Sequence, residues 1–182
     1  MLNYKNVISD DKSYSGLQMK EIKPIMKLII RGKKREFLSA IGKSLNLLLP
    51  TEANTSSRSE KLSALWLSPD EWMIYSNEIS NPDNNNYETE NLLNKNICKT
   101  NLGAVTDVTD QFVLINMKGD KIFDLFETGS PFNFNDFRNK KGSVTQTILA
   151  KIDIIIHNQN LNEVNLFVRR SFSQHLFSWI ND

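Results

Sequence analysis

The sequence feature that most constrains the fold is a regular alternation of apolar and polar side chains between Gly142 and His157. One parity of this segment carries the apolar side chains Val144, Ile148, Ala150, Ile152, Ile154 and Ile156. The other parity is polar, with Ser143, Thr145, Thr147, Lys151, Asp153 and His157. A period of two residues is typical of a strand with one buried face. The pattern therefore predicts a single strand here, with Ile148, Ile152 and Ile154 in the core.

The segment after His157 predicts a hairpin that leads into an amphipathic helix. We expect the turn at Asn158–Asn160. The returning strand alternates Val164, Leu166 and Val168. Ser171 and Gln174 have the spacing of a capping box, in which each side chain satisfies a backbone N–H of the first helical turn. The helix then presents Phe172, Leu176, Trp179 and Ile180 at helical spacing. The predicted core includes Leu166, Val168, Leu176 and Trp179.

The same order of elements occurs twice along the chain. In the first half we expect a strand, a helix, a hairpin and a second helix at Met26–Arg31, Lys33–Ile41, Leu62–Ser76 and Glu88–Lys99. In the second half the strand and first helix are expected at Gln111–Met117 and Asp120–Glu127, followed by the C-terminal hairpin and helix. A short strand at Gly103–Val108 lies between the halves. The pattern predicts an α+β fold: two ferredoxin-like strand–helix–hairpin–helix units in tandem, with antiparallel sheets covered by helices.

The length suits a single domain over residues 1–182. Within it we expect a first pseudo-repeat at residues 22–103 and a second at residues 104–182. Residues 1–21 are expected to form an N-terminal arm, in which Leu2, Tyr4, Val7 and Ile8 are spaced along a polar stretch. Two alternatives stay open for this arm, a disordered tail and a docking segment.

The charge balance argues against several classes of partner. Lys and Arg number 22 against 21 Asp and Glu, so no global field favours nucleic acid or an anionic membrane. The basic run Arg31-Gly32-Lys33-Lys34-Arg35 allows a phosphate or nucleic-acid patch, but the solvated entry to the following helix is the better interpretation.

Cellular location is also constrained by the sequence. The N-terminus lacks the apolar stretch of a secretory signal, and no apolar run reaches the length of a membrane span. The single cysteine, Cys98, excludes an intramolecular disulfide or a Cys-based metal cage from this chain alone. We therefore predict a cytoplasmic protein.

No residue pattern of the chain indicates catalytic chemistry of its own. His157 and His175 lack metal-binding spacing and are interpreted as structural or solvated, and Cys98 as a small buried hydrophobe. Asp107 and Asp110 allow an acid–base pair, but bonding to the local backbone is the better interpretation. Neither of the two common phosphate-binding glycine motifs occurs. We predict no catalytic, cofactor-binding or metal-ligating residue in this chain.

Four side chains are candidates for contact with another protein chain. Trp66 and Trp72 flank the turn of the first hairpin, and Trp is frequent both in cores and in interface hot spots. The Arg169-Arg170 pair precedes the last predicted helix, where the helix dipole disfavours positive charge. The compensating acidic group belongs either to a partner chain or to this chain, for example Asp107 or Asp110. The two tryptophans and two arginines form the predicted subunit interface.

Four blocks of the sequence carry a resemblance to a known family. They are LLLPTEANT (Leu47–Thr55), LWLSPDEWMIYS (Leu65–Ser76), VTDVTDQFVLINMKGDKIFDLFETGSPFNFNDF (Val105–Phe137) and the segment Gly142–Ile180. In this order they resemble the gamma subunit of heterotetrameric sarcosine oxidase. Residues 1–21 and the loop at residues 77–86 lie outside the resemblance.

The resemblance implies a fold similar to the folate-binding domain of aminomethyltransferases. It also implies a non-catalytic subunit of an enzyme that oxidatively demethylates sarcosine to glycine, with formation of hydrogen peroxide and 5,10-methylenetetrahydrofolate. FAD, FMN, NAD and tetrahydrofolate are then expected in the alpha and beta partner subunits, and zinc in the delta subunit.

A free-standing folate-binding regulatory protein is the alternative. Related folate-binding-domain proteins of iron–sulfur metabolism carry a Lys-Gly-Cys-Tyr motif, whereas this chain has Lys141-Gly142-Ser143-Val144 and lacks the thiol.

Overall fold

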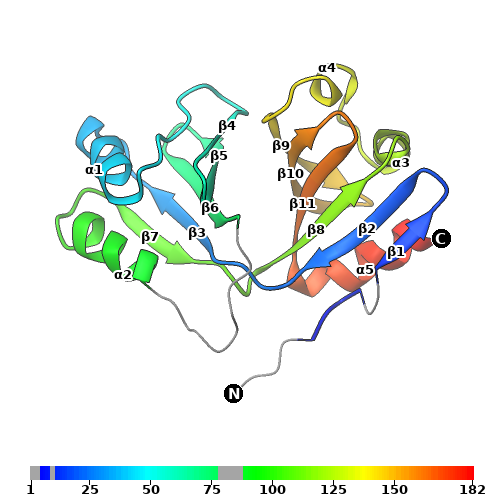
Figure 1. Ribbon diagram of the computed structural model, residues 1–182, viewed down its shortest axis with the longest axis horizontal. Coiled ribbons are helices and arrows are strands. Elements are labelled where there is room, and N and C mark those ends of the chain that lie inside the picture. Colours follow the sequence, from blue (N-terminus) through cyan, green and yellow to red (C-terminus); the bar gives the residue numbers. More distant parts are fainter. Residues whose placement is uncertain (1–4, 9–10, 78–87) are drawn as a thin grey trace. The chain divides into compact units, whose positions relative to one another are not determined.

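The computed structural model describes residues 5–8, 11–77 and 88–182, which belong to two compact units. Met1–Pro24 and Asp110–Asp182 belong to one, called here the terminal unit, and Ile25–Thr109 forms the other, the inserted unit. Each unit contains an antiparallel sheet with helices on it, which confirms the predicted α+β class (Figure 1). The boundaries differ from the predicted pseudo-repeats, because each sheet takes a strand from outside its own repeat.

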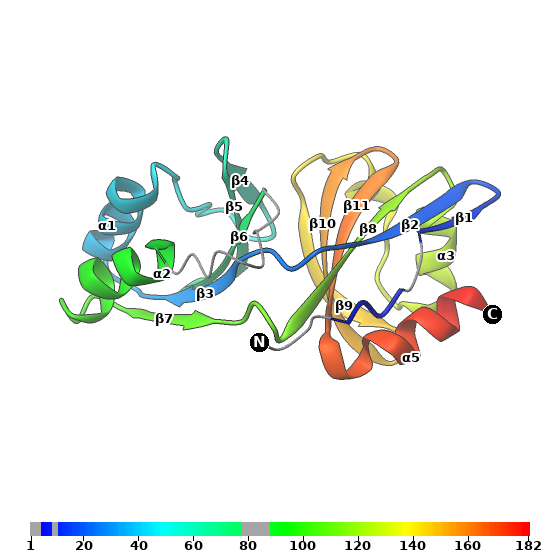
Figure 2. The ribbon, with the colours of Figure 1, turned by 60° about the horizontal axis from the view of Figure 1, so that its bottom comes forward.

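The terminal unit is built on an antiparallel sheet in the order β1-β2-β8-β11-β10-β9. Its strands are β1 Lys12–Tyr14, β2 Leu17–Ile22, β8 Phe112–Lys118, β9 Val144–Leu149, β10 Ile152–Asn160 and β11 Glu163–Arg169. Its helices are α3 Ile122–Gly129, α4 Asn135–Arg138 and α5 Arg170–Asn181. The helices contribute to a core with the apolar side chains of β8, β10 and β11, so they cover the same face of the sheet (Figure 2).

The inserted unit is built on an antiparallel sheet in the order β4-β5-β6-β3-β7. Its strands are β3 Lys27–Arg31, β4 Ser56–Arg58, β5 Leu62–Ser68, β6 Glu71–Ser76 and β7 Ala104–Asp107. Its helices are α1 Arg35–Leu45, α2 Glu88–Leu93 and the π-helical turn η1 Asn94–Cys98. Phe37 and Ile41 of α1 pack against Leu28 and Ile30 of β3, which makes this a core separate from that of the terminal unit.

The predicted single strand at residues 142–157 is a hairpin. Ala150 and Lys151 have φ angles of 52° and 66° and form a two-residue turn between β9 and β10. This reversal pairs Leu149 with Ile152, so the parity that faces the core changes at the turn. Ile152 and Ile154 are buried as predicted, but Ile148 is 39% exposed and the prediction for it is wrong. The favoured residues at such a turn are Asn and Gly, and neither is present to mark it.

Two further local predictions are also wrong. Asn158–Asn160 lies inside β10, and the turn follows it at residues 161–162. Helix α5 begins at Arg170, before the predicted capping box, and its start has no side-chain cap. Leu166, Val168 and Leu176 are buried as predicted, while Trp179 is only partly buried at the edge of the core. The ring of Trp179 lies so close to Gly129 that a Cβ there would come within 2.5 Å of it.

The described part of the N-terminal arm is docked on the terminal unit. Strand β2 pairs with β8, with Glu21 opposite Ile115. The Glu21 carboxylate is buried and accepts hydrogen bonds from the backbone N–H groups of Val7 and Ile8, at 2.6 and 2.9 Å. Ile8 is 2% exposed and belongs to the core. Of the two alternatives the docking segment holds for these residues, and its docking partner is this chain itself; Leu2 and Tyr4 lie outside the described residues.

Residues Ile154 and Ile148 offer a test of the corrected strand register. We expect Ile154→Asp to lower the free energy of unfolding by about 3 kcal/mol or more, because it places an unpaired charge in the core. Ile148→Asp is the matched control, with an expected loss below about 1 kcal/mol. Urea denaturation of both variants checks this. Equal losses would contradict the register.

The docking of the N-terminal segment gives a second prediction. Glu21→Ala removes the acceptor of two backbone N–H groups, and we expect a loss of about 1–3 kcal/mol in the free energy of unfolding. Amide hydrogen exchange at Val7 and Ile8 should accelerate with it. Lys20→Ala is the control, because Lys20 forms an exposed ion pair with Asp11 at 3.0 Å, which contributes at most about 1 kcal/mol. Unchanged exchange at both amides in Glu21→Ala would show that the carboxylate does not hold the segment.

Candidate functional site

The predicted interface residues lie in two separate places. Arg169 ends β11 and Arg170 begins α5, both in the terminal unit. Trp66 and Trp72 face each other across the β5–β6 hairpin of the inserted unit. Each pair lines or borders a surface hollow.

The first hollow, called here the Arg169 hollow, has a volume of about 520 Å³ and lies at one end of the sheet of the terminal unit. Arg169 is paired with Phe112 of β8, and Asp153 of β10 is paired with Ile148 of β9. Because β10 and β11 are neighbours, the two charged residues lie between the two apolar ones. Its lining is completed by Gln146, Thr147, Ile154 and Ile155. Ile148, which was predicted to lie in the core, is exposed and supplies apolar surface to this hollow. A surface that combines apolar side chains with a few charged ones is typical of a protein contact.

Arg170 is bound to its own chain. Its guanidinium Nη2 donates to the backbone carbonyl of Lys5 at 3.2 Å, which ties the N-terminal segment to the start of α5. The Asp107 carboxylate accepts the backbone N–H of Thr109 at 2.8 Å. That bond is the local backbone role expected for Asp107. Arg169 is exposed and is the stronger interface candidate of the two.

The second hollow, called here the Trp66 hollow, has a volume of about 230 Å³. It is lined by Gly32, Lys33, Leu38, Thr51, Ala53, Trp66, Pro69 and Trp72. Trp72 is 3% exposed, its Nε1–H donates to the Pro50 carbonyl at 2.8 Å, and its ring lies 5.9 Å from that of Phe37. Trp72 is therefore a core residue that forms the base of the hollow. Trp66 is only partly buried and is the tryptophan available for contact.

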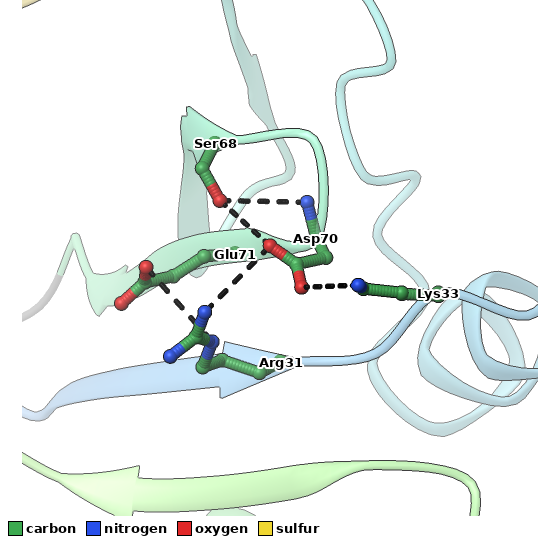
Figure 3. Close-up of polar contacts among 5 residues, drawn as sticks. All are labelled: Arg31, Lys33, Ser68, Asp70 and Glu71. Carbon is green, nitrogen blue, oxygen red and sulfur yellow. Dashed lines mark hydrogen bonds and ion pairs between the residues drawn. The ribbon is translucent and has the colours of Figure 1, made fainter.

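The basic run lies beside this hollow and is paired with the turn of the β5–β6 hairpin (Figure 3). Arg31 lies 3.8 Å from Asp70 and 4.0 Å from Glu71, and Lys33 lies 3.7 Å from Asp70. The Ser68 hydroxyl donates to Asp70 Oδ1 at 2.9 Å. This hydrogen bond lowers the pKa of the Asp70 carboxyl, as do the Arg31 and Lys33 cations, while desolvation acts the other way. Helix α1 begins at Arg35, so the run is the entry to a helix, as interpreted from the sequence.

The remaining candidates for chemistry are dispersed. His157 is buried in β10 with its Nδ1 at 2.7 Å from Gln159 Nε2, whereas His175 is exposed on α5. Cys98 is a partly buried free thiol at the end of η1. In the described ranges no three His, Cys, Asp or Glu side chains are grouped as metal ligands would be. No helix in these ranges is both long and apolar enough to cross a membrane.

The buried polar side chains were not predicted from the sequence, and Asn158 is the clearest example. Asn158 is fully buried in β10, and its Nδ2 donates to the carbonyls of Phe137, Arg138 and Lys140. It thereby holds the loop that leads to Gly142, the residue of the Lys-Gly-Ser-Val segment with a φ of 82°. The available signal was an Asn next to an apolar strand, but Asn is also common in turns, and the sequence therefore predicts a turn there.

The Asp70 network makes a pH-dependent prediction. A carboxyl whose pKa is lowered by folding stabilises the folded state above its unfolded pKa of about 3.9, and this contribution disappears as the pH falls through the lower folded value. We expect Asp70→Asn to be less stable than the wild type at pH 7, with the difference shrinking below about pH 4. Ser68→Ala should raise the Asp70 pKa measured by NMR, because it removes the main cause. A stability difference that stays constant from pH 7 to pH 3 would contradict this account.

Comparison with known proteins places this fold in a family. The model of the "Sarcosine oxidase, gamma subunit family" matches residues 32–182. Comparison with curated proteins gives no significant match.

Two solved structures share the fold. One is the heterotetrameric sarcosine oxidase from Corynebacterium sp. U-96 in complex with pyrrole 2-carboxylate, with a TM-score of 0.79 and 17% identity over 90% of this chain and 81% of that chain. The other is glycine cleavage system aminomethyltransferase T from Bartonella henselae, with a TM-score of 0.64 and 12% identity over 91% of this chain and 45% of that one. This second likeness agrees with the expected similarity to aminomethyltransferases. Because the family model spans most of its length, the chain belongs to the sarcosine oxidase gamma subunit family.

Proposed function

We propose that this chain is the accessory gamma subunit of a heterotetrameric sarcosine oxidase and acts by contact with the other subunits. The observation that carries the proposal is the family match over residues 32–182. The holoenzyme is an oxidoreductase that converts sarcosine to glycine and hydrogen peroxide, with the methyl carbon passing to tetrahydrofolate. Its partners are the alpha, beta and delta subunits, and the assembly works in the cytoplasm.

In this proposal the redox and one-carbon chemistry belongs to the partner subunits. They hold FAD, FMN, NAD and tetrahydrofolate, and the delta subunit holds zinc. This chain supplies the Arg169 hollow, where an exposed guanidinium and the Asp153 carboxylate border apolar side chains. Such a surface supports a specific contact with opposite charges across its rim.

The free-standing folate-binding regulator is the less favoured alternative, since the family match is to an oxidase subunit. Titration of the isolated chain with tetrahydrofolate separates the two functions. Saturable binding in the micromolar range or tighter, together with failure to join the oxidase, would favour the regulator.

We expect the purified chain to be colourless and inactive toward sarcosine, and to co-purify with the alpha, beta and delta subunits when they are co-expressed. Arg169→Glu should weaken this association by about tenfold or more, because it reverses a rim charge. Lys141→Glu makes the same charge change at an exposed loop of the same unit and is the control. Stoichiometric flavin on the isolated chain, or fully active and stable partner subunits without it, would contradict the proposal.

A further inference from the structure

We infer that the Trp66 hollow is a socket for one apolar side chain of a partner subunit, and that carboxylates flanking this anchor pair with Lys34 and Arg35. The inference rests on the proposed function, because it states the chemistry of one partner segment in the oxidase assembly. Four observations carry it: the size of the hollow, the fixed Trp72 ring in its lining, the absence of ion pairs to Lys34 and Arg35 in the described residues, and the position of these two cations at the start of α1.

The size of the hollow indicates a side chain as its occupant. Its volume of about 230 Å³ lies below the range of roughly 300–1,000 Å³ that is usual for small-molecule sites. A single large aliphatic or aromatic side chain matches this scale. Anchors of this kind, seated in preformed pockets, account for much of the binding energy in protein interfaces.

The base of the hollow is fixed before any partner arrives. Trp72 is held by its hydrogen bond to the Pro50 carbonyl and by the Phe37 ring, so it has little freedom to fill the hollow itself. Trp66 lies opposite Trp72 in the strand pairing and remains partly exposed. A preformed apolar wall lowers the entropy lost when an anchor binds. The Trp72 ring in the lining of the hollow is thus held in place by the core of the inserted unit.

Two cations without an ion pair near the hollow favour an acidic partner segment. The strand–helix junction at residues 31–36 carries Arg31, Lys33, Lys34 and Arg35 against the carboxylate of Glu36, and Glu52 lies between the lining residues Thr51 and Ala53. The hairpin turn contributes Asp70 and Glu71, and their ion pairs are with Arg31 and Lys33. No ion pair in the described part of the chain includes Lys34 or Arg35, and both side chains are exposed.

The position of Lys34 and Arg35 strengthens their attraction for carboxylates. Lys34 is the N-cap of α1 and Arg35 is its first residue, where the helix dipole adds positive potential. These two cations are therefore unfavourable for the free chain and become favourable when a carboxylate approaches. Asp70 and Glu71 already show how this junction pairs with acidic groups.

The substitution Lys34→Glu separates an effect on binding from an effect on stability, because the two are expected to change in opposite directions. We expect Lys34→Glu to leave the Tm of the isolated chain unchanged or higher, because it removes a cation from a helix N-terminus. The same substitution should weaken binding to the co-expressed alpha, beta and delta subunits by about tenfold and reduce its salt dependence. Lys43→Glu, at the other end of α1, is the matched control and should bind within about twofold of the wild type.

A second pair of variants tests the socket itself. Ala53 lies on the exposed side of the hollow, so Ala53→Phe should fill it from within and weaken assembly by about tenfold or more. Ala53→Ser keeps the hollow open and should assemble like the wild type. Affinity measured by surface plasmon resonance on the immobilised partner complex reads out all four variants.

The outcomes separate this inference from the proposed function. A wild-type chain that does not bind the partner subunits would overturn the proposed function. A wild-type chain that binds, with Lys34→Glu and Ala53→Phe both within about twofold of it, would overturn the socket alone. A wild-type chain that self-associates, and that Ala53→Phe converts to a monomer, would assign the hollow to a second copy and also overturn the inference.

Discussion

The fold depends on an exchange of strands between the two pseudo-repeats. Strand β2 precedes the first repeat but pairs with β8, the first strand of the second repeat. Strand β7 precedes β8 but pairs with β3, the first strand of the first repeat. Apart from the edge strand β1, the two sheets therefore have the same order, β4-β5-β6-β3-β7 and β9-β10-β11-β8-β2. Because β2 and β8 are far apart in sequence, the terminal unit closes only after the inserted unit has been synthesised, and such non-local pairing is slow to form.

The buried Lys27 holds the chain at the points where it passes from one unit to the other. These points follow Pro24 and Thr109, and the Lys27 ammonium donates to the carbonyls of Ile25 and Thr109 at 3.1 and 3.0 Å. The backbone N–H of Lys27 also donates to the Thr109 hydroxyl. A buried ammonium is tolerated only with such hydrogen bonds, so the two connecting segments are placed together within the inserted unit by one side chain. Lys27 thereby fixes the start of β3 and the end of β7, which pair with each other although they belong to different pseudo-repeats.

Features set by interactions between residues close in sequence could be predicted, and features set by interactions between distant residues could not. Elements defined by local periodicity, such as α1 and the core side of β11, were predicted from their own residues. The exchange of β2 and β7 was not, because pairing partners distant in sequence leave no local pattern. The reversal at Ala150–Lys151 was not predicted because Ile148, Ala150 and Ile152 continue the apolar alternation through the turn. The alternation in the sequence therefore shows no break where the chain reverses. At the candidate site Trp66 and Trp72 are indistinguishable in sequence, and only the Pro50 carbonyl and the Phe37 ring place Trp72 in the core.

Charged and polar side chains are buried in this fold because they bond to backbone groups, although the sequence has no recognisable catalytic motif. Glu21 accepts from two backbone N–H groups, while Lys27 and Asn158 donate to backbone carbonyls. Exchanged strands and long connections leave backbone groups outside the ladders, and each such group needs a partner when it is buried. These side chains are thus used to close the fold. On the surface, by contrast, apolar side chains line the two hollows: Ile148 lines the Arg169 hollow, and Trp66 lines the Trp66 hollow. The buried polar side chains thus serve the fold, whereas Ile148 and Trp66 leave apolar surface at the two hollows.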